Sequence, residues 1–137
     1  MSLVAPLLLA VLVAACDSPA EPDEVSLDRV FDLRAGEAAV VAPDGLRITF
    51  REVRGDSRCP VDVVCVWEGD AEVLLQVETT PEDREEISLH TSGNFATSAA
   101  VLGHLIELKG LQPGNKAGVP TDPRAYVATL FVSRLQR

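Results

Sequence analysis

Two cysteines and a tryptophan lie close together near the middle of this sequence, and they offer its clearest chemistry. Cys59 and Cys65 are separated by a segment that begins with Pro60. This is not the Cys-x-x-Cys spacing of a thioredoxin-like redox motif, and the second pair that a zinc site needs is missing. The spacing therefore predicts a structural disulfide. Closing so short a loop contributes on the order of 2–2.5 kcal/mol to stability in the chain-entropy model.

Trp67 is the only tryptophan of the chain, and it follows the second cysteine closely. On a strand, Trp67 and Cys65 would share a face, which favours an indole that covers the disulfide and seals the end of the core. The alternative is an exposed aromatic platform, with Arg58 beside it, that binds a glycan or a peptide. Asp56 and Ser57 precede Arg58 and are typical of side chains that fix a turn by bonding to nearby backbone N–H groups.

Four acidic residues surround the cysteines and form a candidate calcium site: Asp56, Asp62, Glu68 and Asp70. Carboxylate oxygens are the ligands that Ca²⁺ prefers. The Asp-x-Asp-x-Asp-Gly spacing of a calcium loop is missing, however, and dispersed acids also serve simply to keep a domain soluble. Calcium binding is therefore a secondary hypothesis, and the sequence predicts no other cofactor.

The sequence contains few of the parts that an enzyme needs. It has no Gly-x-Ser-x-Gly elbow, no His-Glu-x-x-His and no phosphate-binding loop. His104 lies on an otherwise apolar face, where a hydrogen-bonded core histidine is commoner than a general base. A small hydrolase that uses His104 is the third hypothesis.

The N-terminal segment has the features of a bacterial lipoprotein leader. Residues 3–15 form an apolar run that is too short for a bilayer span of roughly 20 residues and suits a signal-peptide core. The run ends in Val-Ala-Ala before Cys16, which resembles the lipobox whose cysteine receives the lipid. We expect a signal peptide over residues 1–15 and acyl chains such as palmitate on Cys16, which anchor the protein to the cell membrane or the outer membrane. The leader has no Lys or Arg, and an ordinary signal peptide is the alternative, but that alternative leaves the third cysteine unpaired.

Residues 16–26 are predicted to be the lipidated cysteine and a flexible acidic tether, because residues 17–24 are rich in acids and proline and lack large apolar side chains. Residues 27–137 then form one domain. The formal net charge is −9 and the basic residues are scattered singly, which excludes nucleic acid as a partner. We expect a monomer that contacts the membrane through its lipid and binds an envelope protein, peptide or glycan.

Short alternating segments, separated by turn signals, predict an all-β domain. The clearest is Leu46-Arg47-Ile48-Thr49-Phe50, in which every second residue is apolar. Residues 37–51 are predicted to form a hairpin around Pro-Asp-Gly, and residues 90–100 and 112–124 to be loops. The other predicted strands are 30–33, 71–77, 87–89, 101–111 and 126–135. About seven such strands favour an antiparallel β-sandwich, immunoglobulin-like or similar, or an open barrel.

Residues around the cysteines also carry a family resemblance. Ser-Arg-Cys-Pro at 57–60, Cys-Val-Trp at 65–67 and Gly-Asp-Ala at 69–71 resemble a motif of small, mostly uncharacterised bacterial lipoproteins and secreted proteins. The resemblance implies an extracytoplasmic β-domain and carries no established activity. A non-catalytic binding or structural domain is therefore the leading hypothesis for function.

Overall fold

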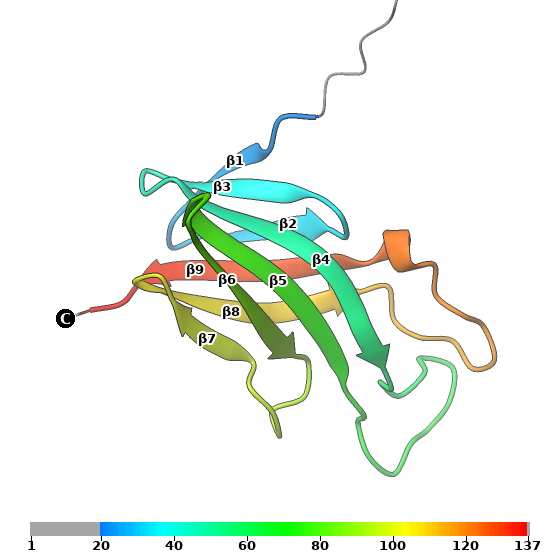
Figure 1. The fold of residues 1–137 in the computed structure, drawn as a ribbon. Helices are drawn as coiled ribbons and strands as arrows, with labels where there is room; N and C mark the ends of the chain where they lie inside the picture. Colours follow the sequence, from blue (N-terminus) through cyan, green and yellow to red (C-terminus); the bar gives the residue numbers. More distant parts are fainter. Residues whose placement is uncertain (1–19, 137) are drawn as a thin grey trace, which may run out of the picture.

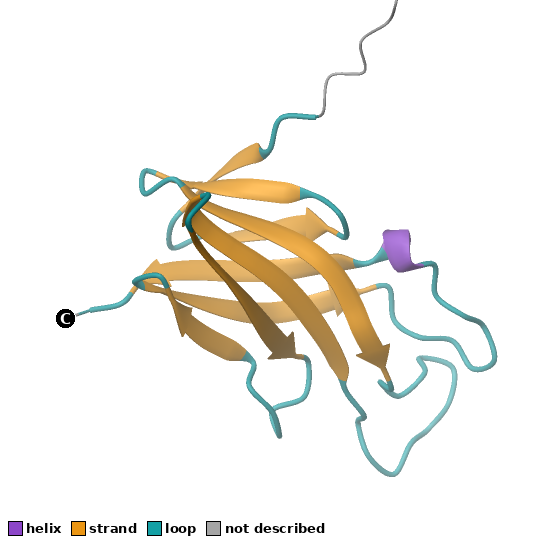
Figure 2. Ribbon diagram, viewed as in Figure 1, coloured by secondary structure: helices purple, strands orange, loops and turns teal. Residues whose placement is uncertain are grey.

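The computed structural model describes residues 20–136, which form two packed β-sheets (Figure 1). The elements in chain order are β1 (Asp23–Ser26), β2 (Val30–Arg34), β3 (Ala38–Ala42), β4 (Leu46–Asp56), β5 (Ala71–Thr80), β6 (Asp83–His90), β7 (Ser98–Val101), β8 (His104–Gln112), the 3₁₀ helix η1 (Pro123–Ala125) and β9 (Val127–Arg134). The predicted all-β class and sandwich arrangement are confirmed, and the sheets do not close into a barrel (Figure 2).

The first sheet has the strand order β1-β3-β4-β5-β6, and β4 and β5 form its centre. The predicted hairpin around Pro-Asp-Gly is β3 and β4, which pair antiparallel with Val41 opposite Leu46. Gly45 occupies the turn with φ +71°, a left-handed conformation that glycine adopts without steric cost. Two irregularities interrupt the pairing of β4 with β5, between Phe50 and Glu52 and between Val53 and Gly55. Such bulges bend a strand, and they lie just before the segment that contains the cysteines.

The second sheet has the strand order β2-β9-β8-β7, and its apolar face packs against the first sheet. Alternation accounts for the core, since every second residue is buried over residues 46–50 of β4, 104–108 of β8 and 128–132 of β9. The largest fully buried side chains come from both sheets: Phe50, Leu46, Ile48, Leu75, Leu89, Ile106, Leu130, Val41, Val73, Val77 and Val132.

Two strands of the structure lie where the sequence predicted none. β1 lies within the segment predicted as tether, where its backbone pairs in parallel with β3 and Val25 packs against the core. An edge strand this short needs little apolar surface, which is why composition did not indicate it. β7 lies partly within the loop predicted at residues 90–100, and it pairs with β8.

The predicted strand at residues 101–111 is broken by a tight turn. Leu102 and Gly103 have φ values of +46° and +77° and join Val101 to His104 across a two-residue hairpin. The alternation suggested that Leu102 and His104 share one face of a strand. Because Leu102 lies in the turn, they do not. The glycine was the signal for this turn.

The predicted signal peptide, Cys16 and the first part of the predicted tether, up to residue 19, lie outside the described residues. Within residues 20–136, the structure contains no helix with the length and apolar character needed to cross a bilayer.

Candidate binding site at the disulfide loop

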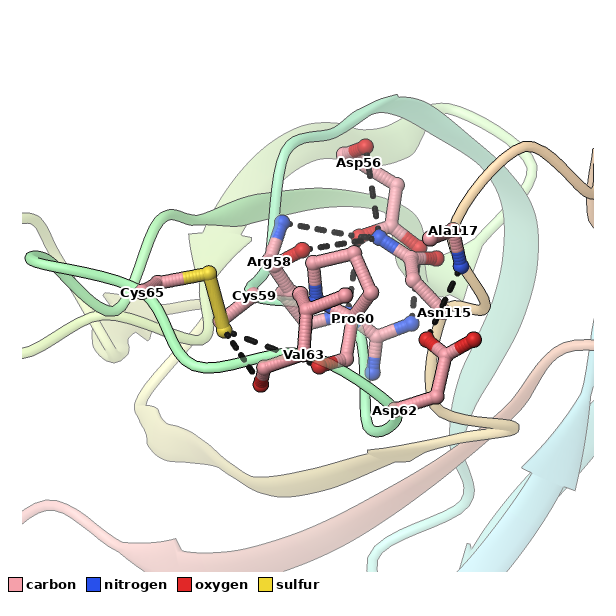
Figure 3. The surroundings of a disulfide bond; sticks show 9 residues. All are labelled: Asp56, Arg58, Cys59, Pro60, Asp62, Val63, Cys65, Asn115 and Ala117. Carbon is pink, nitrogen blue, oxygen red and sulfur yellow. Dashed lines mark hydrogen bonds and ion pairs between the residues drawn. A yellow bond between two sulfur atoms is a disulfide. The ribbon is translucent and has the colours of Figure 1, made fainter.

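The segment between β4 and β5, residues 57–70, is here called the disulfide loop. Cys59 and Cys65 form the predicted disulfide, with their Cα atoms 5.9 Å apart (Figure 3). In Figure 1 the loop hangs from one end of the sandwich, away from the point where the described chain begins. Cys65 is exposed and Cys59 half-buried, so the bridge lies outside the core and fixes the loop alone.

The base of the disulfide loop continues the pairing of β4 with β5. The Ser57 N–H donates to Asp70 O over 2.7 Å, and the Cys59 N–H donates to Glu68 O over 2.8 Å. Gly69 lies between these rungs with φ +67°, and a Cβ placed on it would lie 1.8 Å from Ser57 O. Only glycine allows so close an approach, which sets the positions of Glu68 and Asp70.

Asp56 is the centre of a hydrogen-bond network that holds the disulfide loop against the loop after β8. Its carboxylate accepts from Arg58 Nε at 2.8 Å and Nη2 at 2.7 Å, from Asn115 Nδ2 at 2.9 Å and from the Tyr126 hydroxyl at 2.9 Å. Partial burial raises the pKa of Asp56, but these hydrogen bonds outweigh it, and the pKa lies below its ordinary value. Burial and the bond to Asp56 raise the pKa of Tyr126.

Arg58 serves this network and does not accompany Trp67, contrary to the platform hypothesis. Its Nη1 donates to Leu111 O over 2.7 Å and its Nη2 to Pro113 O over 2.8 Å, in addition to the ion pair with Asp56. The guanidinium is therefore occupied by backbone carbonyls and a carboxylate, and the ion pair raises its pKa. Arg58 and Trp67 also line different surface depressions.

Trp67 is 78% exposed, so the prediction that it seals the core is wrong. The prediction assumed a strand at Cys65 and Trp67, but this segment is loop and has no alternating faces. Val64 and Val66 beside it are 100% and 93% exposed. The disulfide loop thus presents apolar side chains to solvent. The aromatic-platform alternative required Trp67 to be exposed, and it is.

Trp67 lines a surface depression of about 720 Å³ that lies between the disulfide loop and the loop joining β6 to β7. Its lining consists of Ser57, Trp67, Glu68, Gly69, Asp70, Ser92, Asn94 and Phe95. Phe95 is 57% exposed and stacks on His90, with ring centroids 5.0 Å apart. The depression therefore has an exposed aromatic ring on each of the two loops that form it.

The two carboxylates of this depression are held by the β6–β7 loop. Buried Ser92 bonds both, since its hydroxyl donates to Glu68 Oε1 over 2.5 Å and its backbone N–H to Asp70 Oδ1 over 3.0 Å. The other oxygen of Asp70 lies 2.6 Å from His90 Nδ1. Burial raises the pKa of Asp70, but the bonds from His90, Ser92 and Thr91 outweigh it and leave the pKa below its ordinary value.

The four acids of the calcium hypothesis do not converge. Asp56 belongs to the network around Arg58, and Asp62 accepts from the Ala117 N–H over 3.0 Å. Glu68 and Asp70 instead face the depression beside Trp67. Among residues 20–136, no three His, Cys, Asp or Glu side chains are grouped in a way that would hold a metal ion.

His104, the residue of the hydrolase hypothesis, is buried and fully bonded. Its Nε2 lies 2.8 Å from Asp44 Oδ2 and its Nδ1 lies 2.8 Å from Leu102 O. Asp44 also forms an ion pair with Arg134, and the bonds from Arg134 and His104 lower its pKa. The cluster ties the β3–β4 turn to the second sheet, and neither ring nitrogen of His104 bonds a nucleophile.

Sequence reasoning missed the roles of His90 at the end of β6, of Ser92 and Phe95 in the β6–β7 loop, and of Asn115 in the loop after β8. The loops themselves were predicted, but nothing in the spacing indicated that they meet the disulfide loop. Comparison with family models, with curated proteins and with solved structures finds no match to this chain.

Proposed function

We propose that this protein is a lipid-anchored binding protein of the bacterial cell envelope, whose β-domain recognises a peptide, protein or glycan through the depression beside Trp67. The domain is non-catalytic in this proposal. Cys16 carries the lipid, and the acidic residues that follow it connect the anchor to the domain.

The exposure of Trp67 is the observation that carries the proposal. An indole usually lies within a core or an interface, because its large apolar surface gains by leaving water. If a ligand covered roughly 100 Å² of the indole surface, this would contribute about 2–3 kcal/mol to the free energy of binding. Trp67 lies on a loop that is fixed by a disulfide and by the Asp56 network. Binding therefore costs little loss of conformational entropy in this loop.

The export part of the proposal is supported by the disulfide. Such bonds persist in oxidising compartments and are rare in the cytosol. The leader and its Cys16 supply the route and the anchor. Intact-mass measurement of the native protein tests the anchor: we expect acyl groups on a chain that begins at Cys16, and their loss together with membrane association in Cys16→Ser. A native chain without acyl groups would contradict the anchor.

The binding part is tested through fluorescence, because Trp67 is the only indole of the chain. We expect a blue shift when a ligand covers it, measured with separate panels of short peptides and soluble oligosaccharides. Trp67→Ala should abolish binding in calorimetry, whereas Val30→Ala, which trims an exposed apolar residue of β2, should leave it unchanged. A ligand of the domain that binds Trp67→Ala as well as it binds the native chain would refute the site.

A further inference from the structure

The depression beside Trp67 combines an aromatic surface with negative charge. Glu68 and Asp70 line it together with Trp67 and Phe95, and none of its lining residues is Lys or Arg. Within the described residues, neither Glu68 nor Asp70 forms an ion pair with a Lys or Arg side chain, and Asp70 instead bonds His90 Nδ1. The lining therefore has no fixed positive charge of its own to balance its carboxylates.

Glu68 retains hydrogen-bonding capacity toward a ligand. Ser92 occupies its Oε1, while Oε2 makes no hydrogen bond within residues 20–136, and the residue is exposed. The buried Ser92 hydroxyl is fixed in turn, because it accepts from the Asn94 N–H over 3.2 Å. One oxygen of Glu68 is thus held in place while the other has no partner among residues 20–136.

The apolar surface beside these acids suits a long cationic side chain. Lys and Arg have aliphatic stems that cover apolar surface and charged heads that stay with polar groups. An ammonium or guanidinium over an indole gains from the ring quadrupole, and Trp is the best of the aromatic partners. Trp67 and Glu68 are both exposed and line the same depression, so stem-binding and head-binding groups are neighbours.

We propose that the ligand is a basic peptide segment of a partner protein, whose Lys or Arg stem lies on Trp67 and whose charged head is held by Glu68, with the negative charge of Asp70 in the same depression. This rests on the proposed binding function and narrows it to one class of ligand. A neutral glycan would use Trp67 but would leave the carboxylates without a charged partner. An acidic peptide would be repelled by them.

Three probes of different charge test the inference: a trilysine peptide amide, a triglutamate peptide and a neutral trisaccharide. Each is titrated into the mature domain while the emission of Trp67 is recorded, with calorimetry as a second measurement. We expect trilysine alone to bind, and its affinity to fall as salt is raised from low to high concentration. Glu68→Gln, which keeps the acceptor for Ser92, should weaken trilysine binding about two- to fivefold.

Glu85→Gln is the matched control, because Glu85 is exposed on β6 and does not line the depression. Equal weakening by Glu85→Gln would show attraction by the overall charge and overturn the inference. Binding of the trisaccharide or of triglutamate, lost in Trp67→Ala, with no response to trilysine would overturn the inference and leave the proposed site standing. No response to any of the three probes would count against both.

Discussion

Replacing Asp56 by alanine should be the most damaging single change at the disulfide loop. The substitution removes the shared acceptor of Arg58, Asn115 and Tyr126 and leaves a largely buried guanidinium without its counter-ion. A net hydrogen bond contributes about 1 kcal/mol and one to a charged group about 1.5–3 kcal/mol. We therefore expect a loss of about 3–5 kcal/mol in the free energy of unfolding, the range found when a buried ion pair loses one partner.

This loss is measured by urea unfolding and by the melting temperature. For a domain of this size it corresponds to a decrease in Tm on the order of 10–20 °C. Asp62→Ala is the control, because the exposed Asp62 accepts a single backbone hydrogen bond, from Ala117. It should cost about 1 kcal/mol or less. A cost of Asp56→Ala no greater than that of Asp62→Ala would refute the assignment of Asp56 as the centre of the network.

The same residue gives a prediction for pH. Since the pKa of Asp56 is lower in the folded protein than its ordinary value, ionised Asp56 stabilises the fold above that ordinary value, about 3.9. The stabilisation is lost as the pH falls through the lower, folded pKa. The stability difference between the native chain and Asp56→Asn should therefore shrink as the pH is lowered from about 5 toward 2. Asp44 and Asp70, whose pKa values are also lowered, are present in both chains and cancel from the comparison.

Three further predictions concern the disulfide loop. Gly69→Ala should cost several kcal/mol, at least about 2, in urea unfolding, because its Cβ would collide with the Ser57 carbonyl; a cost near that of an exposed Gly118→Ala would contradict this contact. Trp67→Ala should change Tm by less than about 2 °C, since the exposed ring contributes little to the core, and a large decrease would show that the ring is packed in solution. A Cys59→Ser and Cys65→Ser double variant should stay folded by circular dichroism and lose about 2–2.5 kcal/mol; complete unfolding would show that the bridge supports the core.

The alternation of apolar residues predicted the scaffold, because burial on one face of a sheet is a local property of the sequence. Leu46, Ile48 and Phe50 are fully buried, as their spacing indicated. The pairing of Cys59 with Cys65 was predictable because assigning Cys16 to a lipid leaves these two as the remaining cysteines of a chain expected to be exported. Alternation failed at Trp67, where the backbone leaves the sheet and the rule of shared faces no longer applies.

The candidate site depends on contacts between distant segments, which no local pattern records. Phe95 reaches the depression because the β6–β7 loop packs beside the disulfide loop, and Ser92 joins that loop to Glu68. The platform alternative placed Arg58 at the surface beside Trp67, but its partners are Asp56 and the backbone carbonyls of Leu111 and Pro113. Carbonyl groups are present at every residue, so the sequence does not distinguish those that meet a guanidinium.

The place of β2 in the second sheet governs when the chain is able to finish folding during its synthesis. β2 pairs with β9, so one of the earliest strands has the last one as its neighbour, and their side chains meet through Thr129 and Asp32. Pairings so distant in sequence form late, because a long loop must close first. Until the C-terminal residues have been made and released, β2 has no partner and the second sheet is incomplete. The second sheet is therefore completed only once β9 is available to pair with β2.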